Sequence, residues 1–143
     1  MRKRRLGYIL IFILLSFVGK AQLVPFQDSA SHLYGFQDST GKIIVTPQYT
    51  MAENFSDGRA AVNKGAVVQF QNVNGGKWGF VDSIGTLVIP MDYDFVQPFK
   101  DGKARVVKDH KKMLIDKAGN YIDETKVYYI YPNNQPVNWG SKN

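Results

Sequence analysis

The two histidines, His32 and His110, are the residues of this sequence best suited to acid–base chemistry. His32 closely follows Asp28 and Ser29, so the residue types of a nucleophilic triad occur together. No Gly-x-Ser-x-Gly elbow, which would place the serine on a sharp strand-to-helix turn, surrounds Ser29. His110 has no second histidine at metal-ligand spacing, and a structural zinc ion takes about four ligands. We therefore expect neither catalysis nor zinc binding at these residues.

Calcium, phosphate and thiol chemistry are not expected either. Asp92 and Asp94 lack the ligand density of a calcium loop, which ends in a bidentate glutamate. The glycine-rich stretch at 72–79 is not followed by a helix beginning with Lys-Ser or Lys-Thr, as a phosphate-binding loop requires. The sequence has no cysteine, which excludes thiol chemistry and cysteine-ligated metals. We expect no metal site and no cofactor.

Aromatic residues near the C-terminus form a candidate binding surface. The stretch KVYYIYPNNQPVNWG contains Tyr128, Tyr129, Tyr131 and Trp139. Such rings combine an apolar face with a polar edge, which suits stacking on a sugar. One hypothesis is therefore a platform for a glycan. The alternative is a final strand that closes the core, followed by a polar tail at 132–143.

The sequence begins with a leader of the kind that directs export. A basic start, MRKRR, precedes the uncharged apolar run Leu6–Gly19, and small residues at Gly19 and Ala21 precede Gln22. This order is typical of a secretory signal peptide, and the run is shorter than the roughly 20 residues of a spanning helix. We expect residues 1–21 to be removed and the protein to be periplasmic or secreted. The alternative is an uncleaved segment, which would be the protein's contact with the membrane.

The basic character of the chain comes largely from this leader. The formal net charge is +6, from 18 Lys and Arg against 12 Asp and Glu. Five of the basic residues and none of the acidic ones precede Gln22, which leaves 13 basic against 12 acidic. Nucleic-acid binding needs clustered cations, so we do not expect it. One basic cluster remains at Lys100–Lys112, and it suits either a lysine-protected strand edge or an anion site.

A phrase of the form aromatic-Gly-Phe-x-Asp-Ser-x-Gly occurs twice. A shift of 44 positions aligns residues 33–64 with residues 77–108 without a gap, and a partial third copy follows within 112–131. Self-similarity at a period of roughly 20–50 residues is the signature of arrays, solenoids and propellers. The motif residues are Tyr34, Gly35, Phe36, Asp38 and Gly41 in the first unit, Trp78, Gly79, Phe80, Asp82 and Gly85 in the second, and Asp116 and Gly119 in the third.

The first unit, 33–76, carries ten more residues than the offset of 34 between the second and third units allows. The extra residues fall within 65–76, and we expect a lengthened hairpin there. The dipeptide Asn74-Gly75 favours a hairpin turn and is the expected tip. The second unit then spans 77–111, and the third spans 112–131.

Each unit is predicted to consist of short strands. Side chains alternate along a strand, so Trp78, Phe80 and Asp82 share one face. The Asp-x-x-Gly segments suit hairpin turns, because aspartate accepts nearby backbone N–H groups and glycine takes a positive φ. A lone small sheet would leave its aromatic face wet, so the units must stack. We predict an all-β fold of about two and a half hairpin or small-sheet repeats in an open array over 33–131, after a linker at 22–32; the alternative is a partial propeller.

The second unit, KWGFVDSIGTLVIPMDYDFVQPFKDGKARV, resembles the WG (KWG) repeat family. The resemblance covers the chain from Leu33 to about Asp123. The first unit departs from the pattern with Tyr34 for Trp, and the third has Lys112 and Met113 at the Trp-Gly positions, as suits a terminal repeat. The resemblance implies an exported bacterial all-β protein that serves as an interaction or binding module, with no catalytic motif to carry over.

These observations lead to one main functional expectation and one alternative. We expect a non-enzymatic β-repeat module that contacts another envelope or extracellular protein, or scaffolds a complex. The alternative is binding of a cell-envelope polysaccharide through exposed tyrosine and tryptophan.

Overall fold

The computed structural model describes residues 22–69, 72–122 and 128–129. Within these ranges the chain forms eleven strands and no helix, and hence no helix able to cross a membrane. The predicted leader, the tail and the residues Tyr131 and Trp139 lie outside them. The strands are β1 (Val24–Gln27), β2 (Tyr34–Gln37), β3 (Ile43–Tyr49), β4 (Met51–Ala52), β5 (Arg59–Gln69), β6 (Asn72–Asp82), β7 (Leu87–Tyr93), β8 (Phe95–Val96), β9 (Lys103–Lys108), β10 (Lys111–Asp116) and β11 (Tyr128–Tyr129).

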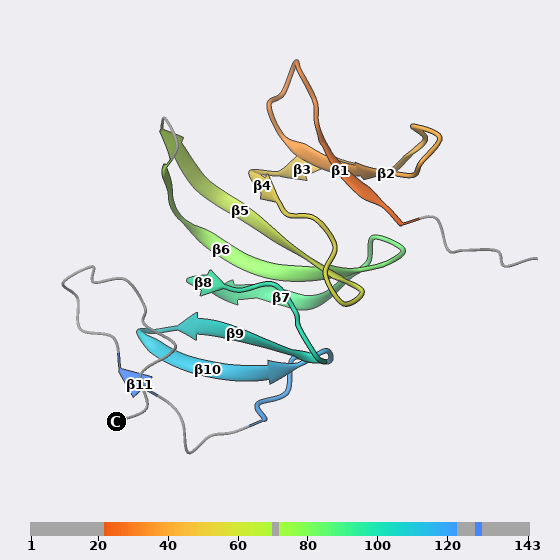
Figure 1. Ribbon diagram of the computed structural model, residues 1–143. Coiled ribbons are helices and arrows are strands. Elements are labelled where there is room, and N and C mark those ends of the chain that lie inside the picture. The colour runs from red at the N-terminus through yellow and green to blue at the C-terminus, as the bar shows by residue number, and fades with distance from the viewer. Residues whose placement is uncertain (1–21, 70–71, 123–127, 130–143) are drawn as a thin grey trace, which may run out of the picture.

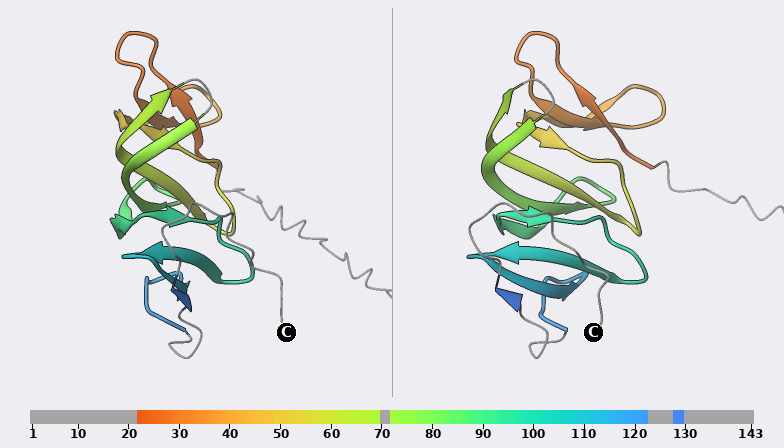
Figure 2. Two further views of the ribbon diagram at one scale, coloured as in Figure 1. Left: turned by 90° about the vertical axis from the view of Figure 1, so that its left-hand side faces the viewer. Right: turned by 60° about the vertical axis from the view of Figure 1, so that its left-hand side comes forward.

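The strands make three small antiparallel sheets. The first sheet has the order β1-β2-β3, the second β4-β5-β6-β7 and the third β11-β10-β9-β8. The sheets lie one above the other, with the first at the top of Figure 1 and the third at the bottom, and the turned views in Figure 2 show the same stack. No sheet in the described part of the chain closes on itself. The predicted all-β fold of tandem hairpin units is confirmed.

The sheets and the sequence repeats are out of phase. Strands β4 and β5 come from the first unit, yet they pair with β6 and β7 of the second unit. In the same way β8 and β9 of the second unit join β10 and β11. The first and second units therefore each contribute a hairpin to one sheet and a strand pair to the next, and the partial third unit contributes only β10 and β11 to the third sheet. Neighbouring units share their backbone hydrogen bonds and are not separate modules.

The segment at 22–32, predicted as a linker, differs from that prediction. It contains β1, which pairs antiparallel with β2 from Val24 opposite Gln37 to Gln27 opposite Tyr34. β1 lies beside β2 as β5 lies beside β6 and β9 beside β10. A strand of four residues that contains a proline has too little periodicity to be recognised from sequence alone.

Two equivalent hydrophobic cores lie between the sheets. The first core packs Phe36, Val45 and Tyr49 of the first sheet against Ala60, Val62 and Val81 of the second. The second core packs Phe80, Ile89 and Tyr93 of the second sheet against Ala104, Val106 and Ile115 of the third. The second sheet is thus buried on both faces, and the repeated motif residues serve to bury it.

The ten-residue insertion forms a lengthened hairpin, as predicted, but its tip lies elsewhere. Pairing between β5 and β6 continues to Gln69 opposite Asn72, so Asn74 and Gly75 lie within the paired strands and not at the tip. Gly75 is a strand residue opposite Ala66. A kink at Gly65 and Gly76, which have φ of 85° and 67°, separates the hairpin's base from its outer part. We call this outer part, residues 65–69 and 72–76, the ribbon.

Candidate functional site

The Asp-x-x-Gly segments form three closely similar turns. The Asp38 carboxylate accepts the backbone N–H groups of Thr40 at 2.8 Å and Lys42 at 3.1 Å. Asp82 and Asp116 accept the corresponding N–H groups two and four residues on. The Thr40 hydroxyl, followed by these N–H groups, lowers the pKa of Asp38. These carboxylates are occupied in closing turns, and the described residues contain no cluster of His, Asp and Glu able to hold a metal ion.

Both histidines lie in turns with a left-handed backbone. His32 has a φ of 58° and follows β1, and His110 has a φ of 63° between β9 and β10. The Asp28 carboxylate accepts both the backbone N–H and the hydroxyl of Ser31, at 2.8 and 2.7 Å. Within the triad considered above, Asp28 is thus engaged by a different serine from Ser29.

A set of polar contacts joins the turn before β5 to the turns of the third sheet. The Asp57 carboxylate accepts the backbone N–H of Gly102 at 2.7 Å and the ammonium of Lys117 at 2.7 Å. Arg59 donates from Nε and Nη2 to the Lys117 carbonyl, at 3.2 and 2.9 Å. These contacts, with one from Ser56 described below, are called the turn joint. They fix the second and third sheets relative to each other at the end where the turns gather.

The turn joint makes stability depend on pH. The Lys117 ammonium, and then the Gly102 N–H, lower the pKa of Asp57. A carboxyl whose folded pKa is depressed stabilises the fold above its unfolded pKa of about 3.9, and this stabilisation is lost as the pH falls through the folded value. Denaturant unfolding at several pH values is expected to show Asp57→Asn less stable than wild type at pH 7, with the gap closing in acid. A gap that stayed constant down to pH 2 would contradict this assignment.

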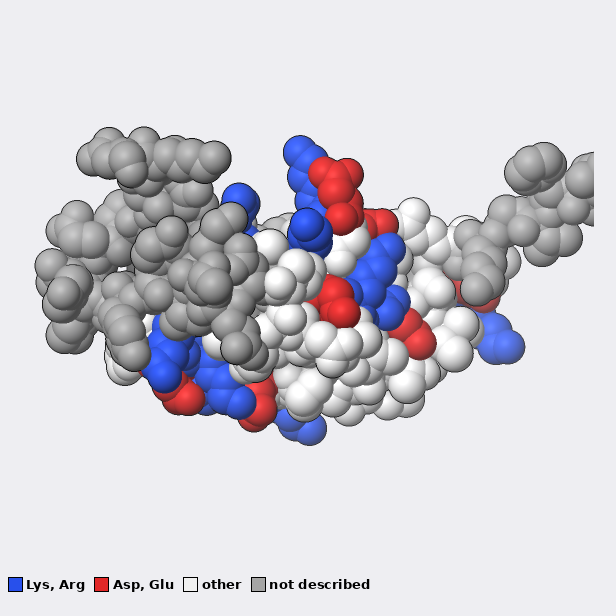
Figure 3. Space-filling model, turned by 90° about the horizontal axis from the view of Figure 1, so that it is seen from below, with Lys and Arg blue, Asp and Glu red and all other residues white. Residues whose placement is uncertain are grey.

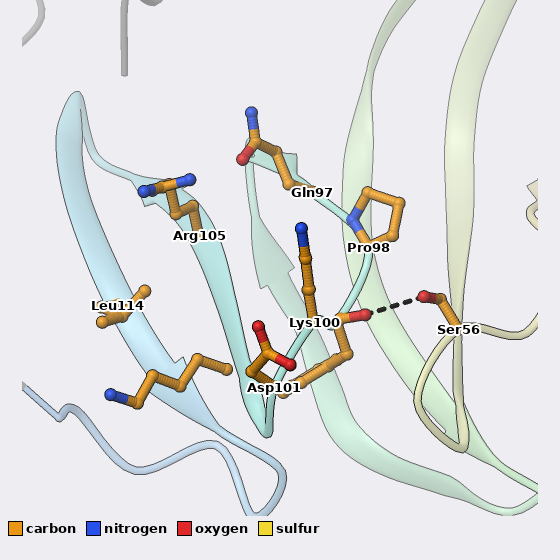
Figure 4. Close-up of a pocket in the computed structure, with 9 residues that line it drawn as sticks. Ser56, Gln97, Pro98, Lys100, Asp101, Arg105 and Leu114 are labelled. Carbon is orange, nitrogen blue, oxygen red and sulfur yellow. Dashed lines mark hydrogen bonds between the residues drawn. The ribbon is translucent and has the colours of Figure 1, made fainter. Parts of the chain in front are cut away.

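A hollow of about 760 Å³, here called the end hollow, lies beside the turn joint. The Ser56 hydroxyl at its rim donates to the Phe99 carbonyl at 2.7 Å (Figure 4). Lys103, Arg105 and Leu114 line it from β9 and β10, and the remaining lining residues are Gln97, Pro98, Lys100 and Asp101. Three cations against one carboxylate give this surface a positive balance. Part of the basic cluster Lys100–Lys112 thus lines the end hollow. The sequence had left the role of this cluster open between protection of a strand edge and an anion site.

The predicted aromatic platform is only partly within the described residues. Tyr128 and Tyr129 form β11, and Tyr128 pairs with Lys112. In the two preceding sheets Tyr49 pairs with Tyr34 and Tyr93 with Trp78, at the corresponding positions. Tyr128 thus occupies the same pairing position in its sheet as the buried tyrosines Tyr49 and Tyr93 occupy in theirs. The strand predicted as the alternative is present, and glycan binding by these rings stays a prediction.

This equivalence was not evident from the sequence, because the third unit has one extra residue between the two paired positions. The tyrosine follows the first motif position by 15 residues in the first two units and by 16 in the third. The turn joint was not evident either, since Asp57 and Gly102 each read as ordinary turn residues. Their 45-residue separation gave no sign that they touch.

The fold and its turns define an all-β repeat protein in which each of the two complete units bridges two stacked sheets. The WG containing repeat family matches the chain at residues 34–66 and 78–111. The chain therefore carries two WG repeats, as the resemblance predicted. No curated protein and no solved structure gave a significant match.

Proposed function

We propose that this protein is an exported, non-enzymatic binding module that docks another protein of the cell envelope on its ribbon. The export part of the proposal rests on the leader sequence. The docking part rests on one observation: the ribbon is an uncharged two-stranded element with exposed valines and open edges. Its sequence, from Gly65 to Gly76, has no charged residue.

The ribbon exposes valines on both of its faces: Val68 and Val73 are cross-strand neighbours on one face, and Val67 lies on the other. Val67, Val68 and Val73 are 57%, 49% and 37% exposed. Single exposed apolar residues are normal on a protein surface, but several on one protruding element mark an interaction site. The second unit folds without such an insertion, so the ribbon is not needed to build a repeat.

Both edges of the ribbon lack a neighbouring strand within the described residues. β4 pairs only with Val62 and Asn63, and the β7 pairing begins at Trp78, so neither strand reaches past the kink. Soluble proteins usually protect such edges with lysine or proline, and the ribbon has neither. An extended segment of a partner can add a strand there, with main-chain hydrogen bonds for affinity and the valines for specificity.

Cross-linking in the native envelope, followed by identification of captured proteins, tests the proposal. Val68→Lys places a charge on the ribbon and is expected to lower capture of the partner about tenfold, without changing the unfolding midpoint. Ile84→Lys is the matched control, because Ile84 is 64% exposed but lies in the turn between β6 and β7. Equal capture by the two variants, or no captured protein, would refute docking on the ribbon.

A further inference from the structure

The third sheet repeats one side of the turn joint, the side that carries an acid and a cation, but no further sheet in the described residues lies opposite it. Residues Asp101 and Gly102 form a turn with φ of 52° and 77°, against 51° and 75° at Asp57 and Gly58. The flanking backbone hydrogen bonds have the same lengths in both turns, 2.8 and 3.1 Å. Asp101 and Lys103 therefore stand where Asp57 and Arg59 stand, one sheet further along the stack.

The side chains of this second turn line the end hollow, and the partners that Asp57 and Arg59 have in the turn joint have no counterpart there among the described residues. Asp57 reaches the next sheet's Gly102 N–H, and Arg59 reaches the next sheet's Lys117 carbonyl. Asp101 and Lys103 line the end hollow instead. In the described part of the chain, neither side chain has a hydrogen bond or ion pair. The end hollow is thus a turn joint whose second half is missing.

The first sheet carries the missing half at the opposite end of the stack. Its DSTG turn has the hydrogen bonding of the DKAG turn, so the Ser39 carbonyl corresponds to the Lys117 carbonyl that Arg59 binds. Extending the register of β1 and β2 by two residues places the Gln22 N–H at the position of the Gly102 N–H. One end therefore presents an acid and a cation, and the other presents an N–H and a carbonyl.

Both ends also leave apolar residues exposed at positions that are buried inside the stack. Val24 is 42% exposed, whereas Ala60 and Ala104 at the same register are buried. Phe26, which corresponds to the buried Val62, is only partly covered. At the other end, Leu114 is partly exposed at the register of the buried Phe80. If the two ends stacked on each other, these residues would be buried, as the residues at the same register are buried in the two internal cores.

The charges of the two ends are complementary. Residues 22–49 carry Lys42 against Asp28 and Asp38, a net charge of −1. Residues 95–122 carry seven Lys and Arg against three Asp, and two of these lysines, Lys108 and Lys117, form ion pairs with Asp92 and Asp57 outside this range, which leaves a net charge of +2. Figure 3, which looks along the stack onto this second end, shows Lys and Arg side chains interspersed with Asp and Glu on the part of the face that is not grey. Opposite charges on two surfaces favour and orient their encounter.

We propose that the end hollow binds the first sheet of a second copy of this chain, so that copies stack head to tail. In the contact, Asp101 accepts the Gln22 N–H and Lys103 donates to the Ser39 carbonyl of the next copy. The two surfaces differ, so the contact is heterologous and extends to a third copy. This inference does not depend on the ribbon, which lies on another part of the molecule.

Sedimentation velocity of the exported chain, which is expected to begin at Gln22, over a range of concentrations tests the stacking. The mean mass is expected to rise beyond a dimer with concentration and to fall with added salt, which screens the exposed charges. Asp101→Asn is expected to lower the association constant about tenfold, since asparagine keeps an acceptor oxygen but lacks the charge that strengthens the hydrogen bond, with the unfolding midpoint unchanged. Asp57→Asn is the matched control, expected to lower the unfolding midpoint and leave the association constant unchanged.

Cross-linking gives a second test, because the chain has no cysteine of its own. A short bis-maleimide is expected to join Lys100→Cys to Ser39→Cys when the two variants are mixed. Ser56→Cys with Lys117→Cys in one chain is the positive control for the same geometry. Ser83→Cys mixed with Lys100→Cys is the negative control, since the second sheet's turn already lies inside the stack.

Three results would overturn the proposal. They are a monomer at every concentration, association that Asp101→Asn leaves intact, and cross-linking to Ser39→Cys no faster than to Ser83→Cys. Each of these results would leave capture on the ribbon unaffected, so a failure of stacking is distinguishable from a failure of docking.

Discussion

Replacing Phe80 with alanine is expected to lower the free energy of unfolding by about 3–5 kcal/mol, which is typical of a buried phenylalanine. Phe80 has no exposed surface and belongs to the core between the second and third sheets. Its ring meets Phe99 edge to face, with centroids 4.8 Å apart and planes at 73°. Domains are commonly stable by only about 5–15 kcal/mol, so this loss removes much of the total. Denaturant unfolding followed by circular dichroism measures it.

Phe95→Ala is the matched control for this prediction. Phe95 begins β8, in the same unit, but 45% of its surface is exposed. We expect a smaller loss, about 1–2 kcal/mol, because only about half of this side chain is removed from water. Phe36→Ala, in the first core, is expected to behave like Phe80→Ala, because Phe36 is also fully buried and packs edge to face on Phe55. Losses of equal size at Phe80 and Phe95 would show that the motif aromatic is not a core residue.

The repeat made these core positions predictable. Phe36 and Phe80 recur at a fixed offset on the same face of a predicted strand, and local alternation is enough to place them inside. The hairpin turns were predictable for a similar reason, since the Asp and Gly of each turn act on backbone groups within four residues. Both inferences use interactions between residues close in sequence.

The features that escaped prediction depend on contacts between distant residues. β1 became recognisable only by its pairing with β2, because it has no earlier copy to align with. The sequence units suggested separate modules, whereas β5 pairs with β6 across the unit boundary. At the candidate site, Asp57 and Asp101 look the same in sequence. Only the stack shows that the first is bound and the second lies in the end hollow.

Substitution of the glycine in the Trp-Gly motif is expected to lower the free energy of unfolding about as much as substitution of the phenylalanine beside it. A Cβ added to Gly79 would lie 2.5 Å from the Ile89 carbonyl oxygen and 2.9 Å from the Pro90 carbonyl carbon. Both atoms belong to the backbone of β7, which pairs with β6 on either side of this point and cannot move away alone. Gly79→Ala is therefore expected to cost about 3 kcal/mol or more by overpacking, measured by denaturant unfolding.

Gly41→Ala separates this steric cost from backbone strain. Gly41 has a φ of +86° and nothing within 4 Å of an added Cβ, so its substitution is expected to cost only the roughly 1–2 kcal/mol of a left-handed alanine. Gly35 stands at the Gly79 position of the first unit, where the added Cβ would collide with the Val45 carbonyl oxygen, and Gly35→Ala is expected to match Gly79→Ala. If Gly79→Ala were as stable as Gly41→Ala, close approach of the return strand would not be the reason for glycine after the motif aromatic. If the predicted order holds, the motif is explained by the crossing of two strands, and ligands must be sought on the ribbon and at the ends of the stack.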